Sequence, residues 1–536
     1  MATFRTFIPL TDFVPDEGRL RTSNLIQLEG FVPYSQHDIL PAQGWVSKSL
    51  TFAGTVYGMG CNALNGPNGY LVYVGYGTDL ASIDTTTLAV TVRSGPSAPY
   101  TFGAEGAQFL AFGKHEVCAP GLTSPVQIRL ADAGNFLDCF TSADKPKAKF
   151  VCGIGERAVF ANIANTGTAG APDPNPDLVW WTKTGDLQTI GNPATLPADR
   201  TDFQALYDDY GGITGLSGSR EYALIFKQGV IYRMDFGSPF GFGFSPIPNS
   251  YGTIYPNSIV RAGEDVFFWG PSGPMVFRQG QVLPLALGRV GRALTDRTFL
   301  AESTTPTITP SAGIRSVVGA FCPVTGVIAW GFPKWLSAAT DIDTILLYNV
   351  AFDRFSILDV GGAATAGLGV TYAMTQVPHE AHDFSALRRI LRVVQQPAGA
   401  LNKLVAWEAG GTYADARGSF RTGYFNLHAS KQVIVKRARL VYAKQAFAAT
   451  DPVYTISCYT RNFGNDTDVT ATGSSATDMD SSLHFVSLNT PAANRRAANL
   501  HAFGVAFGGD STQHPAKTTA EIEGLEIEGD FAGELV

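Results

Sequence analysis

Two adjacent carboxylates, Asp208 and Asp209 in the stretch LYDDYGG, come closest to a catalytic pair in this sequence. Glycoside hydrolysis requires two carboxyl groups on either side of one bond, about 5–10 Å apart. Neighbouring residues of a strand point to opposite faces, so these two side chains cannot flank the same bond. We therefore interpret Asp208 and Asp209 as charges on a surface loop.

A calcium loop is the next chemistry to consider, because the stretch PDPNPD places Asp173, Asn175 and Asp177 at alternate positions. Calcium loops with that spacing also need Gly at the sixth position and Glu at the twelfth. Those positions hold Leu178 and Thr184, and the prolines stiffen the segment. We predict a rigid surface loop, with calcium near Asp173 as the alternative.

The remaining residues form no recognised catalytic motif. The eight histidines include no HxH, HExxH or HxxxH pattern, and His379 and His382 in HEAH lack an identifiable third ligand. The sequence also lacks GxSxG, a P-loop, GxGxxG before a helix, and the Ser-x-Asp-x-Gly-x-Thr-Trp turn of sialidase blades. Such motifs hold the nucleophile, phosphate or metal of many enzymes. We therefore predict no catalytic, cofactor-binding or metal-binding residues, and no enzyme activity.

Basic residues cluster at three places that could contact phosphate. In KQVIVKRARL, strand alternation puts Lys436 and Ala438 on one face and Arg437 and Arg439 on the other. We interpret this strand as a wet, interface-forming edge, with nucleic-acid contact as the alternative. The three clusters are Arg388, Arg389 and Arg392; Lys431, Lys436, Arg437 and Arg439; and Arg495 and Arg496.

Composition is typical of an all-β protein. Charged residues make up 16% of the 536, against roughly 25% in ordinary soluble domains, whereas aromatic residues reach 11%. The chain contains 58 Gly and 31 Pro, which are residues of tight turns. Its net charge of −7 argues against a protein that grips nucleic acid with a basic surface, although DNA could still pass without tight binding.

Cysteine usage and hydropathy add three expectations. The six cysteines have no CxxC spacing, and we expect buried free thiols in so long a chain. The stretch MATFRTFIPLTDFVPDEG lacks a basic segment followed by an apolar one, so we expect no signal peptide. No window approaches about 18 apolar residues without a charge or turn, so we expect no transmembrane helix or membrane insertion.

A repeated hairpin is the strongest signal in the chain. The stretch YALIFKQGVIYRM, residues 222–234, is two apolar runs around a Lys-Gln-Gly turn, in which Gly229 is expected to supply a positive φ. Similar stretches begin near Tyr70, Ala107, Lys149, Asp265, Thr325 and Arg388. The shorter intervals match the 40–50 residues of a four-stranded propeller blade. We predict a degenerate β-propeller of six or seven blades over residues 45–414, with stacked β-sandwiches as the alternative.

The sequence pattern changes after about residue 415. Longer strands with period-2 alternation follow, separated by loops rich in Thr, Ser, Asp and Asn, and this pattern is typical of sheets with one wet face. We predict a separate β-sandwich over residues 415–536. Helical signal is scarce; Leu287, Val290 and Leu294 are spaced for one face of a short helix within residues 283–300.

Residues 1–44 differ in sequence pattern from both the propeller segment and the C-terminal segment. Pro9, Pro15, Pro33 and Pro41 remove backbone donors and fix φ, which suits an extended path better than a central strand. We predict an extended arm that packs on the propeller or on a neighbouring subunit. Its anchors would be the aromatic residues Phe4, Phe7, Phe13, Phe31 and Tyr34.

Two stretches resemble the tail hub or nozzle proteins of short-tailed bacteriophages, also called packaged-DNA stabilisation proteins. The first contains Pro15-Asp16, Asn24 and Gly30-Phe31-Val32-Pro33. The second contains Pro256, Ser258-Ile259-Val260, Phe267 to Gly270, Gly273, Val276-Phe277 and Gly280. The final EIEGLEIEGDFAGEL also resembles the last strand of such proteins. The motifs are structural and closely cover about a quarter of the chain.

The resemblance implies a propeller-bearing subunit of a ring, usually a hexamer, that extends the portal channel and retains and conducts the genome. Portal or adaptor proteins would lie above it, and tail needle, fibre or spike proteins below. The protein would be part of the virion, assembled in the host cytoplasm, and the family carries no catalytic residues. The acidic balance agrees with a channel wall that makes only weak, non-specific contact with DNA. The alternatives are a glycan-binding or glycan-cleaving receptor-recognition tail protein and a cytosolic scaffolding propeller.

Overall fold

The structure is a computed structural model. It describes residues 3–15, 23–33, 35–41, 45–66, 69–84, 89–130, 134–139, 146–164, 175–187, 202–237, 241–291, 294, 317–323, 325–332, 344–359, 371–376, 390–395, 401–407, 418–428, 431–443, 454–461, 469–474, 485–488, 498, 500–507 and 521–534.

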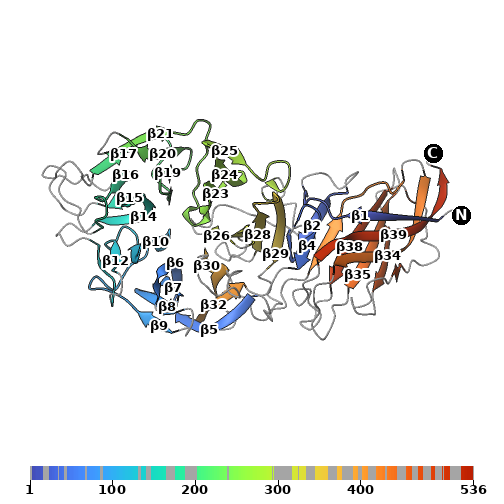
Figure 1. The fold of residues 1–536 in the computed structure, drawn as a ribbon, viewed down its shortest axis with the longest axis horizontal. Coiled ribbons are helices and arrows are strands. Elements are labelled where there is room, and N and C mark those ends of the chain that lie inside the picture. The colour runs from blue at the N-terminus through green and yellow to red at the C-terminus, as the bar shows by residue number, and fades with distance from the viewer. Residues whose placement is uncertain are drawn as a thin grey trace.

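The described strands build a β-propeller of seven four-stranded antiparallel blades around one axis (Figure 1). Blade 1 is β6 (Val56–Gly66), β7 (Gly69–Tyr76), β8 (Asp79–Asp84) and β9 (Val90–Val92). Blade 2 is β10 (Gln108–Phe112), β11 (His115–Ala119), β12 (Gln127–Arg129) and β13 (Leu137–Asp138). Blade 3 is β14 (Lys147–Ile154), β15 (Arg157–Ala164), β16 (Asn175–Trp181) and β17 (Asp202–Ala205). Blade 4 is β18 (Gly215–Gly218), β19 (Tyr222–Phe226), β20 (Ile231–Phe236) and β21 (Phe242–Pro246).

Three further blades complete the ring. Blade 5 is β22 (Val260–Ala262), β23 (Asp265–Gly270), β24 (Gly273–Arg278) and β25 (Gln281–Pro284), preceded by the 3-10 turn η2 (Pro256–Ser258). Blade 6 is β26 (Val318–Cys322), β27 (Val327–Phe332), β28 (Thr344–Asn349) and β29 (Arg354–Asp359). Blade 7 is β30 (Thr371–Gln376), β31 (Ile390–Gln395) and β32 (Leu401–Trp407), with β5 (Trp45–Ala53) as its outer strand.

Strand β5 closes the propeller, because a strand from the start of the chain completes the last blade. It pairs with β32 from Leu401 opposite Ala53 to Trp407 opposite Trp45. The chain then turns at Gly54 and enters blade 1. The sequence prediction of a six- or seven-bladed propeller with a C-terminal sandwich is confirmed, and the alternative of stacked sandwiches is wrong. The hairpin near Arg388 forms β31 and β32.

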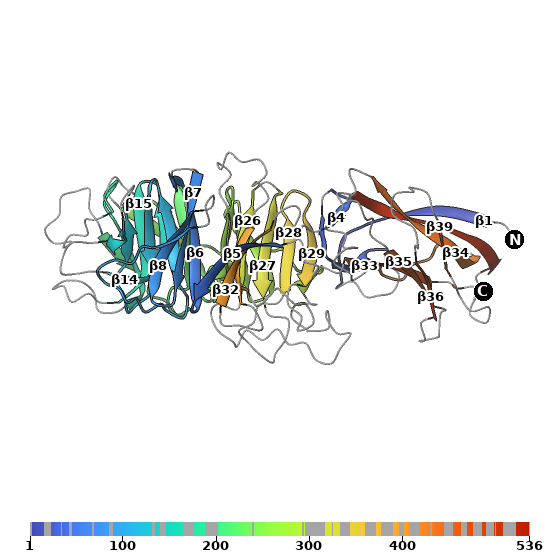
Figure 2. The same ribbon diagram turned by 90° about the horizontal axis from the view of Figure 1, so that it is seen from below.

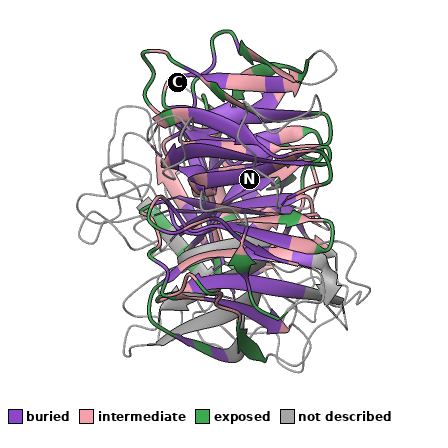
Figure 3. Ribbon diagram, turned by 90° about the vertical axis from the view of Figure 1, so that its left-hand side faces the viewer, coloured by how far each residue is buried: buried purple, intermediate pink, exposed green. Residues whose placement is uncertain are grey.

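Separate apolar clusters lie between neighbouring blades. One cluster joins blades 3 and 4 through Val159, Trp181 and Ile225, and another joins blades 4 and 5 through Phe226 and Phe268, whose rings are 5.1 Å apart. The middle strands are buried on both faces, which explains their continuous apolar runs. Figure 3 shows buried strand interiors and more exposed turns.

The turn between β19 and β20 differs from the sequence prediction. The backbone N–H of Lys227 donates to the Val230 carbonyl (3.0 Å), but Gly229 has no positive φ. A Cβ at Gly229 would lie 2.4 Å from Cδ1 of Tyr210. Glycine is therefore needed for close approach of an aromatic ring, which no local turn rule predicts.

The second domain is a sandwich of two sheets. The first sheet contains β3 (Phe31–Pro33), β4 (Ile39–Pro41), β39 (Glu521–Glu534), β34 (Lys431–Ala443) and β37 (Val486–Ser487), and β1 (Thr3–Pro9) also pairs with β39. The second contains β2 (Leu25–Glu29), β33 (Ser419–Thr422), β38 (Leu500–Phe507), β35 (Tyr454–Arg461) and β36 (Val469–Ser474). Apolar side chains between the sheets include Ile527, Leu525, Ile456 and Val505.

The N-terminal segment is not the arm that the sequence predicts. Its residues form β1 to β4 inside the second domain, and β2 lies between β29 and β33, so blade 6 and the sandwich share one nine-stranded sheet. Pro9, Pro33 and Pro41 each end a strand, as expected for a residue without a backbone donor that interrupts a ladder of hydrogen bonds. Figure 2 shows the two domains side by side, with both termini at the far end of the second.

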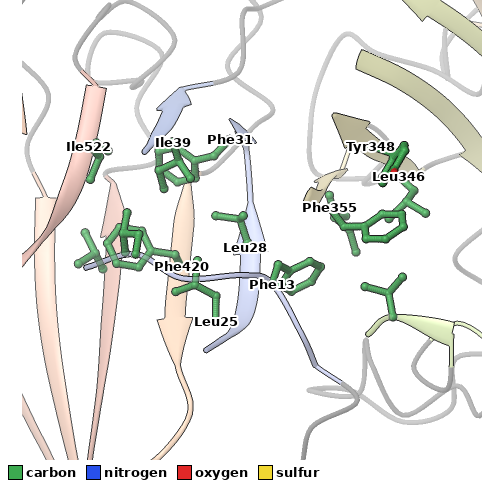
Figure 4. Close-up of a cluster of buried hydrophobic side chains, with 14 of the residues drawn as sticks. Phe13, Leu25, Leu28, Phe31, Ile39, Leu346, Tyr348, Phe355, Phe420 and Ile522 are labelled. Atoms are coloured by element: carbon green, nitrogen blue, oxygen red, sulfur yellow. The ribbon is translucent and has the colours of Figure 1, made fainter. Parts of the chain in front are cut away.

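The expected aromatic anchors take different positions. Phe13 and Phe31 are fully buried, and Phe31 lies with Leu25, Leu28 and Ile39 between the propeller and the sandwich (Figure 4). The rings of Phe4 and Phe531 are 5.1 Å apart, whereas Phe7 is 48% exposed. Tyr34 lies outside the described residues. Removing residues 1–40 would therefore remove part of the core.

The structure also bears on the predictions about the cysteines, the short helix and membrane-spanning segments. All six cysteines are free thiols: Cys118, Cys139, Cys152, Cys322 and Cys458 are buried, and Cys61 is half-buried. Val290 and Leu294 are buried as predicted for one helix face, but Leu287 is 74% exposed, and of residues 283–300 only Gly291 and Leu294 are described as helical. Among the described residues, no helix is long and apolar enough to cross a membrane.

Candidate functional site

The second stretch of the tail-protein resemblance forms the join between blades 5 and 6. The Ser258 hydroxyl donates to the Tyr255 carbonyl (2.7 Å) and accepts from the Trp269 backbone N–H (3.0 Å). The Ser258 carbonyl accepts from Nε1 of Trp330 in blade 6 (3.0 Å). Gly273 and Gly280 have φ values of 94° and 80°, which glycine adopts readily. These motif residues therefore have structural roles.

The first stretch of the resemblance joins the propeller to the sandwich. Gly30, with φ 77°, donates its N–H to the Ile357 carbonyl (2.9 Å), and the Asn349 side chain donates to the Pro33 carbonyl (2.9 Å). Buried Arg354 donates to the carbonyls of Thr11 (2.8 Å) and Ser35 (2.7 Å). Burial lowers the pKa of Arg354, opposed by the nearby charges of Asp12 and Asp38. Sequence reasoning missed Arg354, because its partners, the Thr11 and Ser35 carbonyls and the Asp12 carboxylate, lie more than 300 positions away.

The basic stretch KQVIVKRARL belongs to β34, which pairs with β39 on one side and β37 on the other, so it is not the edge strand that the sequence predicts. Its cations lie on the outer face of the β1–β39–β34 sheet. A register shift between Val435 and Arg437 inserts Lys436 as an extra residue, and Lys436 and Arg437 both reach acidic residues of β39. The predicted separation of Lys436 from the arginines is therefore wrong. The ion pairs are Lys436–Asp530 (2.5 Å), Arg437–Glu528 (2.7 Å), Arg439–Glu526 and Arg5–Glu526.

A single aromatic ring organises the guanidinium groups of this outer face. The Cζ atoms of Arg5, Arg437 and Arg439 lie 5.3, 4.8 and 5.0 Å from the Phe485 ring centroid. We call Arg5, Lys436, Arg437, Arg439 and Phe485 the arginine face. Its four cations meet three carboxylates, so most of the positive charge is neutralised within the sheet. This arrangement is poorly suited to gripping DNA phosphates.

Asp208 and Asp209 have different environments, and Asp208 is more than a loop charge. Fully buried Lys227 donates to Asp208 (2.9 Å), to Asp177 (2.7 Å) and to the Leu206 carbonyl (2.5 Å). Burial alone would raise the pKa of Asp208, but hydrogen bonds from Lys227, the Tyr210 N–H and the Tyr232 hydroxyl lower it. Asp209 is exposed.

Three tyrosines are exposed around this ion cluster. Tyr207, Tyr210 and Tyr251 are 76%, 51% and 60% exposed. The Tyr207 hydroxyl accepts from Asn175 (2.8 Å), and the Tyr210 ring lies on Gly229. We call Tyr207, Asp209, Tyr210 and Tyr251 the tyrosine loop.

Two of the three residues considered for calcium binding, Asn175 and Asp177, are described, and both interact with other protein groups. Asn175 accepts from the Asp177 N–H (2.8 Å), while the Asp177 carboxylate binds Lys227. No group of three or more His, Cys, Asp or Glu residues within the described ranges is arranged to hold a metal ion. Asp173, His379, His382, Arg388, Arg389, Arg495 and Arg496 lie outside the described residues, and the side chain of Arg392 in β31 is not described.

Glu116 is a buried carboxyl group between blades 1 and 2. Its Oε2 accepts from Asn62 (3.2 Å), and its Oε1 has no hydrogen-bond partner among the described residues. Burial raises the pKa of Glu116 to about 8, against the effects of the Asn62 hydrogen bond and the Arg129 charge. Tyr73, which accepts from Arg129 (2.7 Å), completes the network. Nothing in this group resembles a substrate site.

The propeller axis is crossed at one level by side chains of opposite blades. Gln108 of blade 2 donates to Asn257, just before blade 5 (2.7 Å), and Asn257 donates to the Glu105 carbonyl (3.1 Å). A cavity of about 150 Å³ adjoins them, lined also by Met59, Phe109 and Gly319. This volume suits a few water molecules or one side chain better than a drug-sized ligand.

No family model and no curated protein matches this chain. Solved structures with some likeness include Hsv2 of Kluyveromyces lactis (10% identity, 63% of this chain and 70% of that chain, TM-score 0.28) and a chain of the mitotic checkpoint complex (8% identity, 68% and 95%, TM-score 0.36). Hsv2 of Kluyveromyces marxianus is similar (7% identity, 64% and 70%, TM-score 0.28).

Proposed function

We propose that this chain is a structural subunit of a bacteriophage tail, in which identical copies form a ring around the channel through which the genome passes. The observation that carries the proposal concerns the two stretches of the family resemblance. Phe31 of the first stretch and Val260, Phe267 and Trp269 of the second are members of one buried cluster. Both stretches therefore contribute to one buried cluster that extends from blade 5 to the sandwich.

The surface charge supports the conduit role within this proposal. A channel wall that held many phosphates would slow DNA, because each gripped phosphate adds a salt-dependent contribution to affinity. The most basic strand, β34, has its arginines paired with Glu526 and Glu528. With a net charge of −7, the chain offers DNA little electrostatic attraction.

The test is the assembly state of the full-length chain, alone and with the portal and adaptor proteins of its phage. We expect closed rings with a central opening, or monomers that join a portal–adaptor complex as a ring. Electron microscopy and mass photometry would measure both. A chain that stays monomeric and does not bind that complex would overturn the proposal.

A glycan-binding receptor-recognition protein is the second candidate. Exposed tyrosines stack on sugar rings, and Tyr207, Tyr210 and Tyr251 are exposed together with the Asp209 carboxylate. A strict monomer that binds a glycan array, and loses binding in Tyr207→Ser, would favour this candidate.

A further inference from the structure

The tyrosine loop lies at one end of the propeller, where the Tyr207 hydroxyl accepts from Asn175 and the Tyr210 N–H donates to Asp208. Strands alternate in direction within each blade, so the connections after β17 and β21 and the turn between β19 and β20 all lie at the same end. Tyr207 and Tyr210 follow β17, and Tyr251 follows β21. Burying Lys227 with Asp177 and Asp208 costs desolvation free energy, and the cluster fixes the conformation of the loop above it.

A rigid group of exposed tyrosines is characteristic of a protein-binding surface. Tyrosine is enriched at the centres of interfaces, and a pre-ordered ring loses little entropy on binding. The exposed charge in this loop is the Asp209 carboxylate. Aromatic rings beside a carboxylate are suited to a guanidinium, which stacks on the ring and pairs with the acid.

The arginine face of the same chain offers that chemistry. The side chains of Arg5 and Arg437 are 53% and 49% exposed, and within the described part of the chain each pairs with one carboxylate. With Lys436 and Arg439 they leave one positive charge in excess over Glu526, Glu528 and Asp530. Phe485 keeps the guanidinium groups together.

The two surfaces lie at opposite ends of the molecule. Blades 3 and 4 are at one end of the long axis in Figure 1, and the second domain is at the other. A contact between two different surfaces of identical chains is heterologous, and repeating it makes a ring when the rotation closes.

We propose that the tyrosine loop of one copy docks on the arginine face of a second copy. This inference rests on the proposed ring and names its subunit contact. Tyr207, Tyr210 and Tyr251 pack against the exposed guanidinium groups, and Asp209 pairs with Arg437 and supplies the carboxylate that the arginine face lacks.

Charge exchange between two variants tests the contact in the full-length chain. Asp209→Arg alone and Arg437→Glu alone should each weaken self-association at least tenfold, measured by mass photometry over a concentration series. An equimolar mixture of the two variants should assemble again, because the introduced arginine then faces the introduced glutamate and the other contact is native. Tyr207→Ser with Tyr251→Ser should also weaken association at least tenfold.

Two control variants change equally exposed residues at the opposite end of the blades. Glu264→Arg and Phe236→Ser, at residues 85% and 51% exposed, should assemble like the wild type. Rings unaffected by Asp209→Arg and Arg437→Glu would overturn this contact and leave the ring proposal standing. If the wild type forms rings only on the portal–adaptor complex, the same variants are compared on that complex. A wild type that binds the complex without forming a ring would overturn the contact between copies. DNA binding that Arg437→Glu abolishes, without any effect on assembly, would assign the arginine face to nucleic acid instead.

Discussion

At the scale of single residues, the fully buried Lys227 is held by two carboxylates, Asp177 and Asp208, that are distant from each other in the sequence. Asp208 contacts Lys227 whereas Asp209 is exposed, and no local pattern shows that Lys227 is buried between Asp177 and Asp208. Lys227 is 50 positions from Asp177 along the chain. A buried lysine is recognised only after the fold brings its partners together.

The Lys227 cluster leads to a prediction with a matched control in the same loop. Asp208→Asn removes a carboxylate from a fully buried ammonium group and should cost about 1–3 kcal/mol of local stability. Asp209→Asn changes the exposed neighbour and should cost much less. Hydrogen exchange over residues 206–214 and 227–230 measures both variants. Equal protection in the two variants would contradict the role assigned to Asp208.

Glu116 gives a pH-dependent prediction. Its pKa in the folded protein, about 8, lies above its ordinary value of 4.5, so the folded state holds the proton more tightly. The stabilisation of the folded state by protonated Glu116 is fully present below about pH 4.5 and is lost as the pH rises through 8. The melting temperature of the wild type should therefore fall, relative to Glu116→Gln, between pH 5 and pH 9. Parallel pH profiles for the two proteins would contradict the shifted pKa.

At the scale of elements, periodicity predicted the hairpins well and the N-terminal strands poorly. Continuous apolar runs around short turns identified the middle strands of the blades, because these strands are buried on both faces. The sequence of β2, LIQLE, carries no sign of its partners, which lie more than 300 positions away in β29 and β33. Strand β5 was missed for the same reason, since it pairs with β32 at the other end of the propeller.

Arg354 tests whether the N-terminal strands are held by the propeller. Arg354→Ala removes charged hydrogen bonds to the Thr11 and Ser35 carbonyls and should cost about 3 kcal/mol. Residues 3–41 should then become sensitive to protease while blades 1 to 5 keep their protection. Arg233→Ala, which breaks a partly exposed ion pair with Asp235, is the control and should change little. Unchanged proteolysis in Arg354→Ala would show that the apolar contacts alone hold the segment.

At the scale of the whole molecule, the neutralised arginines predict weak DNA binding. The wild type should bind duplex DNA no more tightly than about 10⁻⁴ to 10⁻⁶ M at ~150 mM salt. Glu526→Gln with Glu528→Gln frees Arg5, Arg437 and Arg439, and should strengthen binding and steepen its salt dependence. Fluorescence anisotropy measures both. Sub-micromolar binding by the wild type, with a steep salt dependence, would contradict the proposal of a channel wall that binds DNA only weakly.

The architecture of the whole molecule was more predictable than its surfaces. The blade repeats and the change in sequence pattern after residue 415 can be recognised from the sequence. The tyrosine loop and the arginine face cannot, because each combines residues from separate segments of the chain. Arg5 and Arg437, for example, meet at Phe485 only because β1, β39 and β34 share a sheet.

Electron microscopy of the full-length chain, alone and mixed with the portal–adaptor complex of the phage that is proposed to carry it, tests the proposed ring-forming tail subunit most directly. A ring-forming tail subunit should give closed rings of identical copies, in which the propeller of each copy contacts the second domain of the next. The ring should have an opening wide enough for duplex DNA. Isolated monomers in both samples would contradict the account.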